Sequence, residues 1–421
     1  MMGAYAAHEW DAIVVGGGIV GSLFAALASA SPALRGRRLL VLEGRRPAAN
    51  PARVSAVSPA SADAFRRAGV WQDRILPHAA PYRRMIVCDQ DGRLQFDGND
   101  DGGPLGYVVA NDVLQDALYE RLTTQAGNAD LEFICPATVE SIDNAPNEWP
   151  GVRIAGRDGP LAARLLIGAD GARSVVKRAA GIGTSGLSYN QHGLVATVRV
   201  AAPSATAWQT YLPTGPLAVL PLQDDLASIV WSVPDADVDD LQAMPNASLV
   251  QALNDALGRG DAPDPNSVRR ILRKEHVPAP KVVGIVGKRA AFPLQMQQAE
   301  RYVAERVALI GDAAHVVHPQ AGQGLNLGIQ DAVDLVGCLE DAHGWDWGDV
   351  HLLRQYESKA WSRNALMLGG VHVIDRVFRP QGVFGSLRRL GLDLLNASPD
   401  AKSLLAAVAM GSRSPLHPLA V

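Results

Sequence analysis

Apolar and polar residues alternate in blocks along the first part of the chain, and the block lengths predict strands and helices in turn. The segment 11–15, DAIVV, is a short apolar run that leads into glycines and then into the alanine-rich segment 19–30. The segments 37–45, RRLLVLEGR, and 163–171, ARLLIGADG, contain similar runs. Continuous apolar runs of this length are typical of strands buried on both faces of a parallel sheet, so we predict a Rossmann-like α/β fold.

The pattern changes between residues 183 and 293. Short β-rich runs, separated by Pro, Gly and Asp, predict a mainly antiparallel sheet inserted into the α/β fold. These runs are LVATVRV (194–200), WQTYL (208–212), LAVLPL (217–222) and ASIVWSV (227–233). A smaller strand pair within residues 83–98 is expected to join the same sheet, because the α/β part would otherwise be interrupted there for no evident reason.

Composition limits the class of protein. The chain has 421 residues, 48% of them hydrophobic and 19% charged, which is enough apolar material for two folded domains. The formal net charge of −4 argues against a nucleic-acid-binding protein. Cys88, Cys135 and Cys338 form no CxxC pair, which favours a reducing compartment. With neither a secretory signal nor an apolar run of membrane-spanning length in view, we expect a soluble, cytoplasmic protein.

The first glycine-rich turn has the spacing of a dinucleotide-binding motif. Gly16, Gly18 and Gly21 follow a predicted strand and open a predicted helix, as Gly-x-Gly-x-x-Gly does where a backbone cradles a diphosphate. The next strand ends at Glu43, an acid suited to accept hydrogen bonds from ribose hydroxyls. These residues predict a site for FAD or NAD and leave open which of the two binds.

Two further strands end in an acid and a turn. Asp170 follows one of them. Asp312 follows the other, at the start of the segment 311–335, GDAAHVVHPQAGQGLNLGIQDAVDL. His315 and His318 in that segment have the i, i+3 spacing of metal ligands. However, no third Cys, Asp or Glu ligand lies at a matching spacing, so we predict no metal site. The glycines fit close contact between the backbone and a flat ring.

Together these segments resemble a known family. The glycine turn, GADGARS (168–174) and the segment 311–335 occur in the order found in flavin-dependent aromatic hydroxylases of the para-hydroxybenzoate hydroxylase type. With ARVSAVSPASADAFRRAGVW (52–71) and the closing AMG, the chain is most similar to the ubiquinone-biosynthesis hydroxylase subgroup. The resemblance implies FAD-binding parts at 1–80, 105–182 and 294–345, substrate-domain parts at 81–104 and 183–293, and a C-terminal helical segment at 346–421.

The resemblance also implies roles for single residues. Gly16, Gly18 and Gly21 would hold the FAD diphosphate and Glu43 the adenosine ribose. Asp312 would bind the ribityl or diphosphate region, and Asp170 would support the same groove. The other cofactor-binding positions that it implies are Arg53, Asn111, Val139 (through its backbone), Gly322, Gln323, Gly324, Leu325 and Asn326. Arg53, Pro319, Gly322 and Gln323 are the catalytic candidates, since they would lie next to the isoalloxazine ring.

The expected function is that of an FAD-dependent monooxygenase. It would hydroxylate an aromatic ring through a flavin C4a-hydroperoxide, with NAD(P)H as a transient electron donor and O₂ as co-substrate. The resemblance alone favours a prenylated phenol of ubiquinone biosynthesis as the substrate. The nearer alternative is the same chemistry on a soluble aromatic compound; a carboxylate is less favoured because Arg199 is the only obvious arginine on the inserted strands. A flavin-dependent isoprenoid reductase and an FAD-holding assembly subunit without turnover are the alternatives from other classes.

The C-terminal segment has two interpretations. Its amphipathic stretches, interrupted at Pro380 and Pro399, fit packing against the FAD-binding domain or against a second subunit. Alternatively, Arg376, Arg379, Arg388 and Arg389 would face lipid headgroups, so that the protein lies peripherally on the inner membrane.

Overall fold

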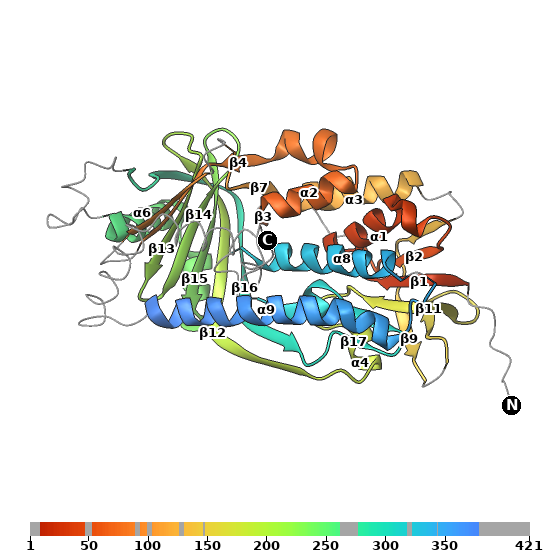
Figure 1. Ribbon diagram of the computed structural model, residues 1–421. Helices are drawn as coiled ribbons and strands as arrows, with labels where there is room; N and C mark the ends of the chain where they lie inside the picture. The colour runs from red at the N-terminus through yellow and green to blue at the C-terminus, as the bar shows by residue number, and fades with distance from the viewer. Residues whose placement is uncertain are drawn as a thin grey trace, which may run out of the picture.

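Figure 1 shows a computed structural model of the chain, in which two sheet-based parts lie side by side. The structure describes residues 9–46, 53–88, 93–98, 103–125, 130–145, 148–261, 277–317, 322–342 and 344–378. None of the helices in these ranges is long and apolar enough to cross a membrane.

The first part is built on a largely parallel sheet. Its strand order is β17 (Val303–Ala304), β18 (Val307–Leu309), β11 (Leu161–Gly168), β1 (Trp10–Val15), β2 (Leu39–Leu42) and β8 (Leu131–Ile134). The antiparallel strands β9 (Val139–Asp143) and β10 (Gly151–Ile154) extend it beside β11. The helices α1 (Ile19–Ala30), α3 (Asn111–Gln125) and α8 (Gly324–Glu340) pack side by side over it, with α9 (Val350–Phe378) next to α8.

The continuous apolar runs explain this arrangement. Every residue of β1 is buried, and β2 is buried throughout, because helices and loops cover both faces of the sheet. Removing each Val, Leu or Ile side chain from water contributes up to about 1.5–3 kcal/mol, which drives this layer to form. The predicted Rossmann-like fold is therefore confirmed.

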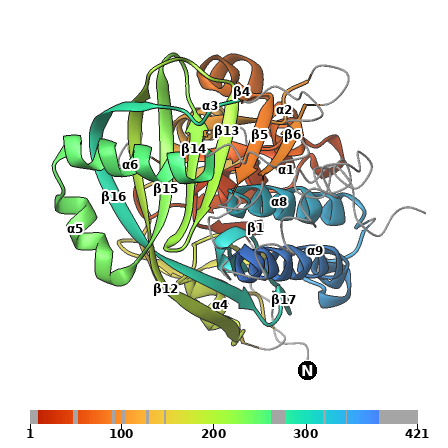
Figure 2. The ribbon, with the colours of Figure 1, turned by 90° about the vertical axis from the view of Figure 1, so that its left-hand side faces the viewer.

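The second part is an eight-stranded sheet (Figure 2). Its strand order is β19 (His315–Val316), β16 (Val282–Ala299), β12 (Thr184–Val200), β15 (Leu226–Pro234), β14 (Gly215–Pro221), β13 (Thr206–Leu212), β5 (Arg84–Cys88) and β6 (Arg93–Asp97). All neighbours pair antiparallel except β13 and β5, which are parallel. The expected pairing of the 83–98 strands with the inserted sheet is confirmed.

Helices cover one face of this second sheet. α5 (Val238–Ala243) and α6 (Asn246–Asp261) lie on the face turned away from the first part (Figure 2). Leu194, Ala196 and Val198 of β12 share a hydrophobic core with Leu249 and Leu253 of α6. Because side chains alternate along a strand, the odd-numbered residues of β12 point to the opposite face, toward the first part.

Smaller elements fill the space between the two parts. A three-stranded sheet has the order β3 (Val54–Val57), β7 (Gly106–Ala110) and β4 (Ala80–Tyr82), and α2 (Pro59–Arg67) follows β3. A π-helix (Trp71–Ile75), the short helix α4 (Val175–Ala179) and a 3-10 turn, η5 (Gly311–Ala313), complete the elements used below. The remaining 3-10 turns are Pro32–Leu34, Leu76–His78 and Asp235–Asp237.

Two long strands join the parts directly. β12 and β16 pair from Thr184 and Ala299 in the first part to Val200 and Val282 at the far end of the second sheet. β16 thus continues across residue 293, where the sequence suggested a domain boundary. At the other end of the chain, α9 is one helix as far as Phe378, and the breaks expected at Pro380 and Pro399 lie outside the described residues.

Candidate functional site

Four parallel strands bring the sequence motifs to one edge of the first sheet. β18, β11, β1 and β2 are parallel neighbours, so their carboxyl ends meet there. Gly16 follows β1, Glu43 follows β2, Asp170 follows β11 and Asp312 follows β18. This edge is where open α/β sheets bind their ligands.

The fold itself requires two of the three motif glycines. Gly16 has φ +102°, and a Cβ on it would lie 2.4 Å from the carbonyl oxygen of Ala169. A Cβ on Gly21 would lie 2.0 Å from the carbonyl oxygen of Gly16. Both distances are far below a van der Waals contact, so glycine lets the β1–α1 turn pack against β11 and α1 against its own turn.

Gly18 is different. It precedes α1 in an extended conformation, and a Cβ on it would meet no protein atom within 4 Å. No side chain caps α1, so the amides of its first turn stay available beside this open space. The fit to a diphosphate is good, because backbone amides and the positive end of the helix dipole face a place that the protein leaves free.

Glu43 is oriented by backbone amides. Its Oε2 accepts a hydrogen bond from the Gly17 amide at 2.7 Å, and its Oε1 accepts one from the Arg45 amide at 3.1 Å. A carboxylate has about four acceptor positions, so Glu43 keeps capacity for ribose hydroxyls.

Two further side chains, which the sequence did not reveal, fix the turn between β1 and α1. Gln115 of α3 donates from Nε2 to the Gly17 carbonyl at 2.9 Å, and Ser22 donates from its hydroxyl to the same oxygen at 2.7 Å. Gln115 lies 98 residues away along the chain, and no local pattern marks it.

The charges of Asp312 and Arg53 act on each other. Burial raises the pKa of the Asp312 carboxyl, and the charges of His315 and Arg53 partly offset this. Asp312 is nevertheless exposed to solvent at its surface. The structure thus places within electrostatic range two residues that are far apart in sequence and that the resemblance placed at the flavin.

Gly322 and Gln323, directly before α8, lie next to β3. Gly322 has φ +58°, and a Cβ on it would lie 3.4 Å from the Cβ of Ala56 in β3. Gln323 precedes the helix without a side-chain cap, and the first turn, Gly324 to Asn326, has no acidic residue. The free amides at this end of a 17-residue helix therefore present positive charge toward β3.

Asn326 holds this loop in place. Its Oδ1 accepts from the Ser58 amide at 3.0 Å and from the Ser61 hydroxyl at 2.7 Å, while its Nδ2 donates to the Ala56 carbonyl at 2.8 Å. The side chain is engaged by protein on both sides, so it acts on the site by positioning the loop.

Three other predicted positions have local partners. Asp170 accepts from the Val175 amide at 2.6 Å, while its Oδ1 is buried with no partner among the described residues. Asn111 accepts from the Ser55 hydroxyl at 2.7 Å. Val139 begins β9 and packs against the first core. The unpaired Oδ1 of Asp170 suits a water or a cofactor hydroxyl as donor.

The histidines of the 311–335 segment separate in the structure. His315 is buried and its Nε2 lies 2.6 Å from the Oδ2 of Asp331, so the ring serves an internal contact. His318 and Pro319 lie outside the described residues.

The fold and the edge define a dinucleotide-binding protein, and comparison with known proteins gives the family. A family model described as an FAD binding domain matches residues 9–368. The mitochondrial ubiquinone biosynthesis monooxygenase COQ6 of Danio rerio is 34% identical over 439 residues, covering 95% of this chain and 89% of that protein. The Homo sapiens COQ6 is 32% identical and covers 97% of this chain and 94% of that protein. The chain belongs to this family and is an FAD-dependent monooxygenase.

Solved structures agree on the fold. The p-nitrophenol 4-monooxygenase PnpA from Pseudomonas putida DLL-E4 has a TM-score of 0.72 at 19% identity, covering 96% of this chain and 99% of that chain. PqsL, a probable FAD-dependent monooxygenase from Pseudomonas aeruginosa, has a TM-score of 0.71 at 23% identity, with coverages of 91% and 99%.

Proposed function

We propose that the chain hydroxylates the aromatic ring of a prenylated phenol in ubiquinone biosynthesis, with NAD(P)H as the transient electron donor. The observation that carries this proposal is the full-length similarity to COQ6, at 34% identity over 95% of the chain. The site described above adds the means to hold FAD, whose reduced ring activates O₂ when bound.

The chain's own residues bind and orient the cofactor in this proposal. The α1 amides beside Gly18 hold the diphosphate, Glu43 holds the adenosine ribose, and Asp312 accepts from hydroxyls of the ribityl chain. The amides of the first α8 turn, Gly324 to Asn326, would stabilise negative charge on a flavin ring bound there and so favour its reduction. Arg53, whose charge acts on Asp312, adds a second positive charge to the site.

The second sheet supplies the substrate side. Its face toward the first part carries Val195 of β12 and, on β16, Phe292, whose ring a Cβ on Gly193 would meet at 2.9 Å. Arg199, the arginine that a carboxylate substrate would need on these strands, is exposed and forms an ion pair with Asp225. This favours a neutral ring with an apolar substituent over a soluble aromatic acid.

One assay tests the proposal. The purified holoenzyme is given NADH or NADPH, O₂ and either a prenylated phenol or a benzoate without a side chain. We expect faster donor oxidation with the prenylated phenol and a product heavier by one oxygen atom. Product that forms equally well without O₂ would instead identify a reductase. An FAD-loaded protein that turns over neither compound would favour the assembly-subunit alternative.

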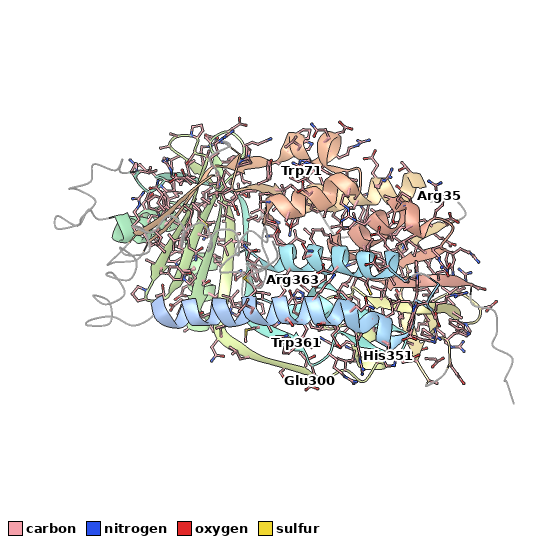
Figure 3. The ribbon with its side chains drawn as sticks, in the orientation of Figure 1. Arg35, Trp71, Glu300, His351, Trp361 and Arg363 are labelled. Carbon is pink, nitrogen blue, oxygen red and sulfur yellow. The ribbon has the colours of Figure 1, made fainter. Side chains whose placement is uncertain are left out.

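We also propose that α9 brings the protein to a lipid surface, where a prenylated substrate resides. Trp361 and Leu366 of α9 remain 41% and 55% exposed, and Trp361 is labelled in Figure 3. Flotation with liposomes tests this: Trp361→Ser together with Leu366→Ser should reduce binding at least severalfold. Equal flotation of this variant and of the unchanged protein would refute it.

A further inference from the structure

A buried cluster of polar side chains connects the turn at Gly311 with α8 and α9. At its centre lies Asp331 of α8, which is fully buried. Its Oδ2 accepts a hydrogen bond from the Gly311 amide at 3.0 Å and lies 2.6 Å from Nε2 of His315. One oxygen of Asp331 is therefore committed to the segment that carries Asp312.

The other oxygen is committed to α9. Oδ1 of Asp331 accepts from Arg363 at 2.7 Å and from Nδ2 of Asn364 at 3.0 Å. Arg363 also forms an ion pair with Asp334, one turn further along α8. Figure 3 shows Arg363 between α9 and α8, and Asn364 is fully buried. The two oxygens of the carboxylate thus contact different segments: Oδ2 contacts the segment around Gly311, and Oδ1 contacts α9.

The electrostatics keep this carboxylate ionised. Burial alone would raise the pKa of Asp331, but His315, Arg363 and Asn364 outweigh it and hold the pKa below its ordinary value. An ionised carboxylate makes short, strong hydrogen bonds, and moving it inside a protein core is costly. Asp331 is therefore a fixed point for the groups that contact it.

Asp331 is one of several groups that contact this turn. Gly311 has φ +60°, a conformation that glycine adopts easily, and its carbonyl accepts a hydrogen bond from the Ala314 amide at 2.8 Å within the turn. A Cβ on Gly311 or on Gly328 of α8 would press on Val20 of α1 at 3.2 Å or 2.8 Å, so the turn also sits closely between two helices. The amide that Asp331 fixes belongs to Gly311, the residue directly before Asp312.

We propose that Arg363 and Asn364 are positioning residues for FAD: they orient Asp331, which orients the Gly311 amide and thereby the Asp312 carboxyl. The C-terminal helix α9 then sets the affinity for the cofactor without touching it. The competing explanation is that the cluster only joins α8 to α9 and contributes stability alone.

The test compares full-length variants as holoenzymes. Asn364→Ala removes one donor to Asp331, Arg363→Gln removes the charge, and Arg363→Lys keeps the charge without the two-pronged contact. Arg354→Gln, on an exposed site of the same helix, is the matched control. Dilution of each holoenzyme and the fluorescence of released FAD give its Kd, and thermal unfolding gives its stability.

We expect Kd for FAD to rise about tenfold in Arg363→Gln, by a smaller factor in Asn364→Ala, and to recover partly in Arg363→Lys. Arg354→Gln should leave Kd unchanged. If Arg363→Gln does not fold, Asn364→Ala decides. A variant with reduced stability but a Kd within about twofold of the unchanged protein overturns the proposal. The assay contains no substrate, so its outcome is independent of the proposed hydroxylation.

Discussion

Gly18 and Gly21 lie in the same turn, yet the fold requires glycine at only one of them. A Cβ at Gly21 would lie 2.0 Å from the Gly16 carbonyl oxygen, whereas a Cβ at Gly18 would meet nothing within 4 Å. At residue 21 the protein's own backbone excludes a side chain. At residue 18 only a bound ligand, such as the FAD diphosphate, would exclude one.

This contrast predicts opposite phenotypes. Gly18→Val should lower the free energy of unfolding by no more than about 1 kcal/mol but yield largely FAD-free protein. Gly21→Ala should destabilise the fold by about 3 kcal/mol because backbone blocks the new methyl group. Urea unfolding of the apoprotein and the flavin absorbance of each purified variant separate the two. Stoichiometric FAD in Gly18→Val would contradict the assigned cradle.

Removal of the Asp312 carboxylate should weaken FAD binding. A charged acceptor for hydroxyl groups contributes about 1.5–3 kcal/mol, so Asp312→Ala should raise Kd by roughly 10- to 100-fold. Glu305→Ala, at an exposed position seven residues earlier, is the control. Fluorescence titration measures both, and an unchanged Kd in Asp312→Ala would remove this residue from the site.

The same residue predicts a pH dependence. Burial raises the pKa of Asp312 above its ordinary value of about 3.9. Since only the ionised carboxylate accepts from the cofactor, FAD affinity should be constant above this raised pKa and fall as the pH drops through it. FAD release should thus begin at a higher pH than for an ordinary Asp. Asp312→Ala should lack this step, and a release profile shared by both proteins would contradict the assignment.

Asp331 should contribute stability that is lost in acid. Its folded-state pKa is depressed, so its contribution is fully present above the unfolded-state value of about 3.9 and disappears as the pH falls through the lower, folded-state value. Asp331→Asn should cost about 3–5 kcal/mol at pH 7, because the Gly311 amide, His315 and Arg363 lose a buried charged acceptor, while Arg363 keeps its ion pair with Asp334. The difference between the two proteins should shrink below about pH 4. Urea unfolding at several pH values measures it, and a constant difference would refute it.

Asn326 and Asn254 provide a matched pair. Each bridges two segments through its side-chain amide, but Asn326 joins the start of α8 to β3 and α2, whereas Asn254 of α6 bonds both backbone groups of Val282 in the second sheet. Each Asn→Ala change should cost about 1–3 kcal/mol of stability. Only Asn326→Ala should also shift the visible absorption of bound flavin and weaken its retention. A spectral change in Asn254→Ala of the same size would show that the effect is not local.

Features marked by residue type or spacing were predictable from the sequence. The three glycines, Glu43 and the strand-end acids were found because a parallel sheet places successive carboxyl ends along one edge. The inserted sheet followed from the change in apolar period. Gln115 and the contacts of Asp331 with α9 could not be found, because they are single hydrogen bonds between distant segments. The sequence provided grounds to reject His315 as a metal ligand but did not reveal its partner Asp331, because tertiary packing sets that contact.

The paired strands β12 and β16 limit how the two parts can move relative to each other. Two hydrogen-bonded strands that continue from one part into the other resist stretching and shear, so the parts cannot move apart as domains joined by a flexible linker can. The register of their pairing shifts between Ser188 and His192, where Asn190 has φ 52°, and again between Val195 and Thr197 and between Arg199 and Val200. We expect the strand pair to bend most easily at these shifts. The two parts should therefore change their relative tilt more readily than their separation.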